Sequence, residues 1–133
     1  MPDRLEEFRR FRERMNERIL GAGNLEIKRF FALDGRCYEP GALDARTKEL
    51  LGLVASLVLR CDDCITYHVI RSRQEGVTDE EFFEAFSVGL VVGGSIVIPH
   101  LRRAVDTLDQ LGADASAVAV PAAGHDGHGG GVG

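Results

Sequence analysis

Apolar residues recur every three or four positions along most of the chain, which is the spacing of an α-helix and not of a strand. The first such stretch, 5–20, is highly charged and carries a sparse apolar stripe, so it predicts an amphipathic helix lying on a larger surface. A short second helix is expected over 25–33, closed by turns at Asp34-Gly35 and Pro40-Gly41. Since no segment alternates as a strand would, we predict an all-α fold of about six helices.

The remaining helices are expected in the second half of the chain. The third covers 45–59 behind an N-cap at Asp44, and the fourth runs over about 61–75. Thr78-Asp-Glu-Glu81 is a capping box, in which the threonine hydroxyl meets the amide of Glu81 and the glutamate reaches back, so the fifth helix begins there. The last helix is expected over 97–111.

Length and composition predict one folded domain. The chain has 133 residues, of which 44% are hydrophobic, and this is enough for a single core. We place the domain at 1–112, with its centre at 31–111. The segment 113–133 is mostly Ala, Gly, Ser and Val, and we expect it to be disordered, its His125 and His128 included.

Charge and cysteine content narrow the class of protein. A net charge of −5 and a pI near 5.3 argue against a nucleic-acid or anionic-membrane surface. The longest uncharged stretch, around 86–99, is shorter than the roughly 20 residues that span a bilayer. The sequence does not open on an apolar leader, and we expect a cytoplasmic protein. In a reducing compartment three cysteines indicate catalysis or metal binding more than a disulfide scaffold.

The strongest chemical motif is Cys61-Asp-Asp-Cys64-Ile-Thr-Tyr-His68. At a helix start, steps of three and four residues bring both sulfurs and the imidazole to one face. Cα atoms three residues apart at this point lie roughly 5 Å from each other, within the range that a disulfide can bridge. A helix N-terminus and a nearby imidazole lower a thiol pKa from about 8.5 into the range of roughly 3.5 to 7.5. The motif predicts a redox dithiol with a built-in base. His68 is better placed to exchange a proton with Cys64 than with Cys61, and we expect Cys61 to be the outer thiol of the pair.

Glu49 is the candidate partner that orients His68. It shares its helical face with the small residues Ala45, Gly52 and Ser56, so a second helix can approach and enclose the carboxylate. The alternative is an ordinary solvated glutamate beside Lys48.

Together these residues resemble the signature of the AhpD-like alkylhydroperoxidases, within the carboxymuconolactone decarboxylase superfamily. Glu49 followed by Cys61-x-x-Cys64-x-x-x-His68 matches that signature in order and spacing, and the resemblance covers roughly 31–111. It implies a helical subunit that assembles as a homotrimer or homohexamer. It also implies an antioxidant enzyme, a peroxidase with peroxiredoxin-type activity that reduces small hydroperoxides.

The resemblance also implies roles for the four residues. Cys64 would become the sulfenic acid, Cys61 would resolve it as a redox disulfide, and Glu49 and His68 would relay protons. An external dithiol of unknown identity would reset the site, with no cofactor. One position departs from the pattern: AhpD itself has a second histidine where this chain has Asp63, whose negative charge opposes thiolate formation.

Two further residues are candidates or bystanders. His100, near the start of the last helix, is a possible supporting residue of the cysteines together with Asp63, or else a core or surface histidine. Cys37 lies in a turn-rich stretch and is interpreted as a bystander thiol.

Four rival interpretations remain open. A thioredoxin-like oxidoreductase would need a strand before the CxxC, and none is expected there. A zinc site would need Cys37 or His100 as a fourth ligand beside Cys61, Cys64 and His68. A lactone decarboxylase of the same superfamily would not rely on a cysteine pair. In a non-catalytic oligomeric scaffold the thiols would be incidental.

Overall fold

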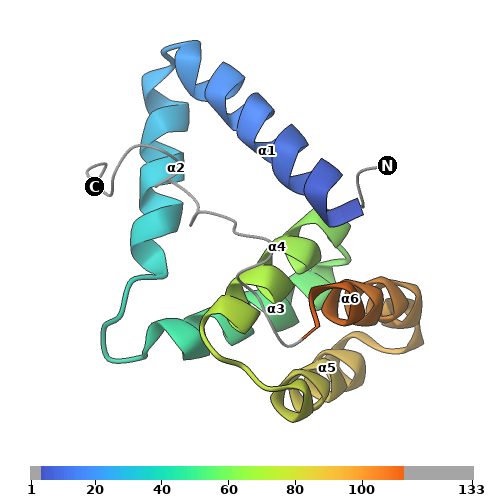
Figure 1. Ribbon diagram of the computed structural model, residues 1–133. Coiled ribbons are helices and arrows are strands. Elements are labelled where there is room, and N and C mark those ends of the chain that lie inside the picture. The colour runs from blue at the N-terminus through green and yellow to red at the C-terminus, as the bar shows by residue number, and fades with distance from the viewer. Residues whose placement is uncertain (1–3, 113–133) are drawn as a thin grey trace. The chain divides into compact units, whose positions relative to one another are not determined.

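The protein is described here from a computed structural model that covers residues 4–112. In that range it has six α-helices, one short 3-10 helix and no strand, which confirms the predicted all-α class (Figure 1). The described residues fall into two compact units, 4–40 and 41–112, which are taken separately below. The single domain over 1–112 stays a prediction, and the tail 113–133 with His125 and His128 lies outside the described residues.

The first unit consists of two helices. The first, α1, covers Arg4–Gly21, and α2 covers Leu25–Cys37 behind the N-cap Asn24, whose side chain accepts a hydrogen bond from the amide of Ile27 at 3.0 Å. The expected turn at Asp34-Gly35 is wrong, because α2 continues through both residues. Gly35 is buried inside the helix. A glycine costs a helix only about 1 kcal/mol relative to alanine, so it does not end one by itself.

The second unit contains four helices and carries the candidate chemistry. These are α3 (Ala45–Leu59), α4 (Asp62–Gln74), α5 (Asp79–Gly93) and α6 (Ile98–Leu111), with the 3-10 turn η1 (Ser95–Val97) before α6. Helix α3 packs against both α4 and α5, and α4 also packs against α6. Helix α4 therefore has α3 and α6 as its neighbours.

Local signals in the sequence set the ends of these helices. Asp44 accepts a hydrogen bond from the amide of Thr47 at 2.8 Å, and the capping box of Thr78 and Glu81 is complete, which confirms both predicted N-termini. Gly76 has a φ of +89°, a left-handed conformation that glycine adopts without strain. The predicted end of α4 near Gly76 is confirmed.

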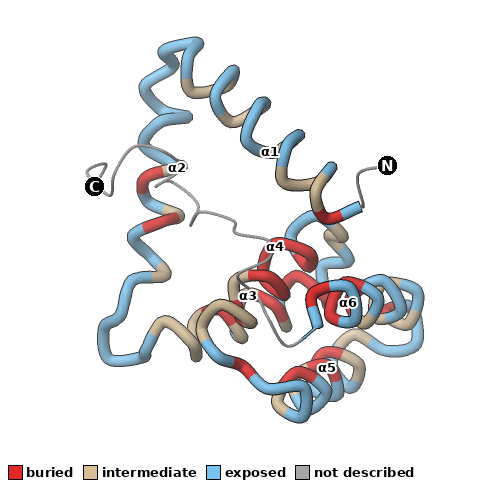
Figure 2. The backbone as a smooth tube through the Cα atoms, viewed as in Figure 1, coloured by how far each residue is buried: buried red, intermediate tan, exposed pale blue. Residues whose placement is uncertain are grey.

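The core of the second unit lies between its helices (Figure 2). Apolar side chains on the inner faces of all four helices and of η1 are almost fully removed from water, and such burial is the main favourable term in folding. They are Leu53, Leu57, Ile65, Val69, Ile70, Phe82, Phe86, Val97, Ala104, Leu108 and Leu111.

A close approach at the end of α5 depends on glycine. A Cβ at Gly93 would collide with the side chain of Val97 and would lie 3.7 Å from the Cα of Val58. The missing side chain thus lets α5 end against α3 and lets η1 fold back beneath it. Gly94 follows with a φ of +82°, which turns the chain toward α6.

Several large apolar side chains remain exposed on the second unit. The sequence leaves five apolar residues outside the stripes of the predicted helices, namely Val88, Val91, Val92, Ile96 and Ile98. The first four are more than half exposed, whereas Ile98 is only partly exposed. Leu51, Leu59 and Phe83 add to this apolar surface. No helix within residues 4–112 is both long enough and apolar enough to cross a membrane.

Candidate active site

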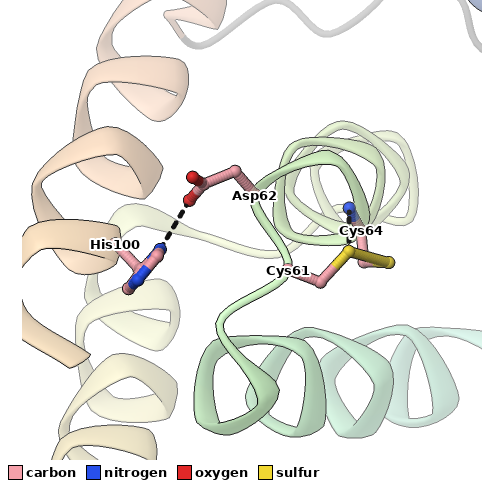
Figure 3. The surroundings of a disulfide bond; sticks show 4 residues. All are labelled: Cys61, Asp62, Cys64 and His100. Atoms are coloured by element: carbon pink, nitrogen blue, oxygen red, sulfur yellow. Dashed lines mark hydrogen bonds and ion pairs between the residues drawn. A yellow bond between two sulfur atoms is a disulfide. The ribbon is translucent and has the colours of Figure 1, made fainter. Parts of the chain in front are cut away.

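The two cysteines of the motif lie at the start of α4 and form a disulfide (Figure 3). Their Cα atoms are 5.3 Å apart, within the usual range for this bond. The sequence predicted Cys61 as the first residue of this helix, but in the structure it is the N-cap. Its sulfur accepts a hydrogen bond from the amide of Cys64 at 3.3 Å. The pair thus closes the first turn of the helix through both the disulfide and this hydrogen bond.

A left-handed residue places the cysteines at this point. Helix α3 ends at Arg60, which has φ 60° and ψ 41°, and the chain reverses there. The amides of Arg60 and Cys61 bond back to the carbonyls of Leu57 and Ser56 at 3.0 and 3.1 Å. Because the turn is this short, α4 begins directly after α3 and runs beside it.

The exposure of the two cysteines differs from the expected order. Cys64 is exposed in the isolated chain, whereas Cys61 is only partly exposed. The expectation that Cys61 is the outer thiol is therefore wrong for the single subunit. The cause is local. Cys61 is the N-cap and its amide is bonded to the last turn of α3, while Cys64 lies in the first turn of α4 and is exposed.

Behind the cysteines, Glu49 and His68 form a buried pair. Nδ1 of His68 lies 2.9 Å from Oε1 of Glu49, and the side chains are 10% and 1% exposed. Glu49 is therefore not a solvated surface glutamate. The contact joins α3 to α4, and Ser56 on the same face of α3 is also buried, as expected from its small size. An Nδ1–H that donates to the carboxylate leaves the lone pair of the imidazole on Nε2.

Arg71 is a third member of this buried group that the sequence analysis missed. Its Nε lies 3.7 Å from Oε2 of Glu49, the oxygen that does not contact His68. A second branch of its guanidinium donates to Gln74 at 2.7 Å. A buried carboxylate is costly unless it is paired, and Arg71 offsets that cost. The signal was its spacing, since Arg71 follows His68 by three residues and so shares its face of α4.

A second histidine reaches the cysteine turn from α6. Nδ1 of His100 lies 2.8 Å from Oδ1 of Asp62, and Nη1 of Arg103 lies 3.3 Å from Oδ2 of the same carboxylate. Of the two alternatives for His100, the structure shows the one in which it approaches the motif, and there it contacts Asp62. Asp62 and Arg103 were both missed, because the contact depends on the packing of α6 against α4.

Three further side chains, those of Asp63, Tyr67 and Cys37, differ in their surroundings. Asp63 is exposed on the cysteine turn. Tyr67 is buried, and its ring meets that of His68 edge-on with 5.2 Å between ring centroids. Cys37 is exposed and is the last residue of α2, so it lies in a helix and not in a turn. Among residues 4–112, no three His, Cys, Asp or Glu side chains are grouped so that they could hold a metal ion.

The sequence matches a known protein family over most of the described helices. Residues 27–107 match the model of the Carboxymuconolactone decarboxylase family, and this range includes every residue of the site described above. The chain belongs to the carboxymuconolactone decarboxylase family.

Individual relatives agree with this assignment. Crystal structures of a Thermotoga maritima protein superimpose with TM-scores of 0.77 and 0.76 at 62% and 61% identity. They cover 79% of this chain and 92% and 89% of the Thermotoga chains. One of the two is described as a carboxymuconolactone decarboxylase family protein for which involvement in an antioxidative response is suggested.

Two curated relatives have no characterized function. Uncharacterized protein 4 in the cox locus of Paracoccus denitrificans is 35% identical over 82 residues, 62% of this chain and 74% of that protein. An uncharacterized protein of Cupriavidus necator is 27% identical over 75 residues, which are 56% of this chain and 66% of the Cupriavidus protein.

Proposed function

We propose that the protein is a thiol-dependent peroxidase that reduces small hydroperoxides through Cys61 and Cys64. The observation that carries this proposal is the buried contact between Glu49 on α3 and His68 on α4, the helix whose N-cap and first turn hold the two cysteines. A redox dithiol needs a base that can take a proton from one thiol and return it later. The buried imidazole with a carboxylate on Nδ1 meets that need.

The proposed reaction begins at Cys64. Its proton passes to Nε2 of His68, and the thiolate attacks the terminal oxygen of the hydroperoxide. The O–O bond breaks, the Cys64 sulfur is oxidised to a sulfenic acid, and the leaving alkoxide takes the proton from His68 to become an alcohol. Glu49 holds the tautomer and stabilises the imidazolium between the two transfers.

The second half of the cycle involves Cys61. Its thiol attacks the sulfenic sulfur of Cys64, water leaves, and the disulfide seen in the structure forms. An external dithiol then supplies two electrons and two protons, and it leaves as a disulfide. Each turnover thus converts one hydroperoxide and one dithiol into an alcohol, water and a disulfide.

A mass-spectrometric experiment tests this proposal most directly. The reduced protein is treated with one equivalent of an organic hydroperoxide, and the peptides are examined for a link between Cys61 and Cys64. We expect the mass of the linked peptide to fall by two hydrogens within the mixing time of a manual experiment. A dithiol that persists through several equivalents of peroxide would contradict a peroxidase and favour the decarboxylase or scaffold alternatives.

We further propose that the protein acts as a closed homo-oligomer, a trimer or hexamer, in the cytoplasm. The exposed apolar side chains of α5 and η1 support this, because such surface is usually covered by another subunit in obligate oligomers. Val91 and Val92 are 85% and 67% exposed at the end of α5. Multi-angle light scattering at low micromolar concentration tests it, and a monomeric mass there would contradict it.

A further inference from the structure

Asp62 and Asp63 lie side by side between the two cysteines, yet only Asp62 is held by α6. Each carboxylate oxygen of Asp62 has its own partner, the imidazole of His100 on one and the guanidinium of Arg103 on the other. His100 and Arg103 are three residues apart on α6, so they share one face of that helix. Asp63 is exposed and lies outside this contact.

The direction of the Asp62 side chain matters for the sulfurs. Figure 3 shows its carboxylate pointing toward α6, while the two sulfur atoms lie on the other side of the turn. A carboxylate close to a thiol disfavours the thiolate, since the two negative charges repel. A carboxylate that is turned away and bonded to cationic or donor groups exerts less of this effect.

We propose that His100 and Arg103 hold the Asp62 carboxylate away from the cysteine sulfurs, so that Asp63 is the acidic residue of this turn that opposes thiolate formation. His100 and Arg103 are then positioning residues, which act on the thiols through Asp62. This inference refines the dithiol of the proposed function. It is independent of the peroxide, because the reactivity of a thiol can be measured without any turnover.

The two aspartates provide a matched comparison. The background is the reduced protein with Cys37→Ser, and the rate of alkylation by iodoacetamide is followed from pH 5 to 10, with the modified cysteine identified by mass spectrometry. We expect Asp63→Asn to accelerate alkylation at pH 7 by roughly two- to fivefold, the scale of a partly screened charge. Asp62→Asn should change the alkylation rate by less than half as much, because the Asp62 charge is already held away from the sulfurs.

A variant of the histidine tests the contact itself. His100→Leu releases the Asp62 carboxylate and should slow alkylation at pH 7 by roughly two- to fivefold. The midpoint of the pH profile should rise, and the limiting rate at high pH should stay the same. In the Asp62→Asn background the same substitution should have no further effect, since the charge it would release is absent. His100→Gln, which keeps a donor for Asp62, should stay closer to the wild type.

Two results would overturn the proposal. One is an equal acceleration by Asp62→Asn and Asp63→Asn. The other is a slowing by His100→Leu that persists in the Asp62→Asn background, which would indicate a general loosening of the fold. If His100→Leu does not fold, as judged by circular dichroism, the comparison of the two aspartates still decides. A protein that fails to consume peroxide would leave these alkylation results unaffected.

Discussion

Two histidine–carboxylate pairs join α4 to its neighbours α3 and α6, with almost the same contact distance but in different surroundings. The contact between His68 and Glu49 measures 2.9 Å, and that between His100 and Asp62 measures 2.8 Å. Glu49 is 1% exposed, whereas Asp62 is 43% exposed. The same contact is worth far more in a dry interior than beside water, because solvent screens the exposed pair. This difference supports the proposal that the buried pair transfers protons and the exposed pair positions Asp62.

The comparison is tested most severely by removing each cysteine. If the buried pair serves Cys64, Cys64→Ser should abolish peroxide consumption, since the attacking thiolate is lost. Cys61→Ser should instead leave a sulfenic acid trapped on Cys64. Labelling with dimedone followed by peptide mapping checks this. Dimedone on Cys61 would reverse the two roles, so that Cys61 and not Cys64 would be the thiol that attacks the peroxide.

The next largest effect is expected at Glu49. Glu49→Gln removes the charge that orients His68 while it keeps the shape of the side chain. Alkylation of the reduced protein at neutral pH should slow by about 10²-fold, the scale of general base catalysis, with a much smaller change in stability. Asp62→Asn is the control from the exposed pair. Equal rates in the wild type and Glu49→Gln would show that the buried pair is structural only.

Arg71 allows a finer test of the buried pair. In Arg71→Gln the buried Glu49 carboxylate loses its nearby guanidinium, so it is less well compensated and holds the imidazole of His68 less firmly. We expect alkylation at pH 7 to slow by about tenfold, less than in Glu49→Gln, where the carboxylate itself is lost. Arg71→Lys should recover part of the loss. An unchanged rate in the glutamine variant would exclude Arg71 from the relay.

The smallest effect is expected at an exposed ion pair far from the cysteines. The Arg46 guanidinium, together with the backbone of Thr78, lowers the pKa of Glu81 to about 2. A carboxyl whose pKa is lower in the folded state stabilises the fold above about pH 4.5 and loses this effect as the pH falls toward 2. Glu81→Gln keeps the capping box but not the charge. It should lower the unfolding temperature slightly at pH 6 and not at pH 2, with Glu80→Gln as the control.

Much of the fold follows from local patterns in the sequence. The caps at Asp44 and Thr78 and the stop at Gly76 depend on residues within four positions, and all three are correct. The end of α2 was misplaced because Gly35 has two possible uses. A glycine marks a turn where its backbone needs a positive φ, but in α2 it is a small buried residue on a continuous helix.

The candidate site divides in the same way. The small neighbours of Glu49 on α3 left a buried and a solvated carboxylate both open, and the resemblance to a family signature favoured the buried one, while the motif itself supplied His68. The contact of Asp62 with His100 spans 38 positions in the chain. It follows from how α6 packs on α4, and no local pattern distinguishes Asp62 from Asp63. The catalytic roles of Glu49, His68 and the two cysteines stay predictions.

The hydrogen bond between the Cys64 amide and the Cys61 sulfur links the redox state of the pair to the dynamics of α4. A thiolate is a stronger acceptor than a neutral disulfide sulfur, because charged acceptors form the stronger hydrogen bonds. Reduction thus removes the covalent link across the first turn, and loss of the Cys61 proton would strengthen the hydrogen bond that stays. We therefore expect the hydrogen-exchange rate of the Cys64 amide to differ between the oxidised and the reduced protein, so that this rate follows oxidation without any added dye or label.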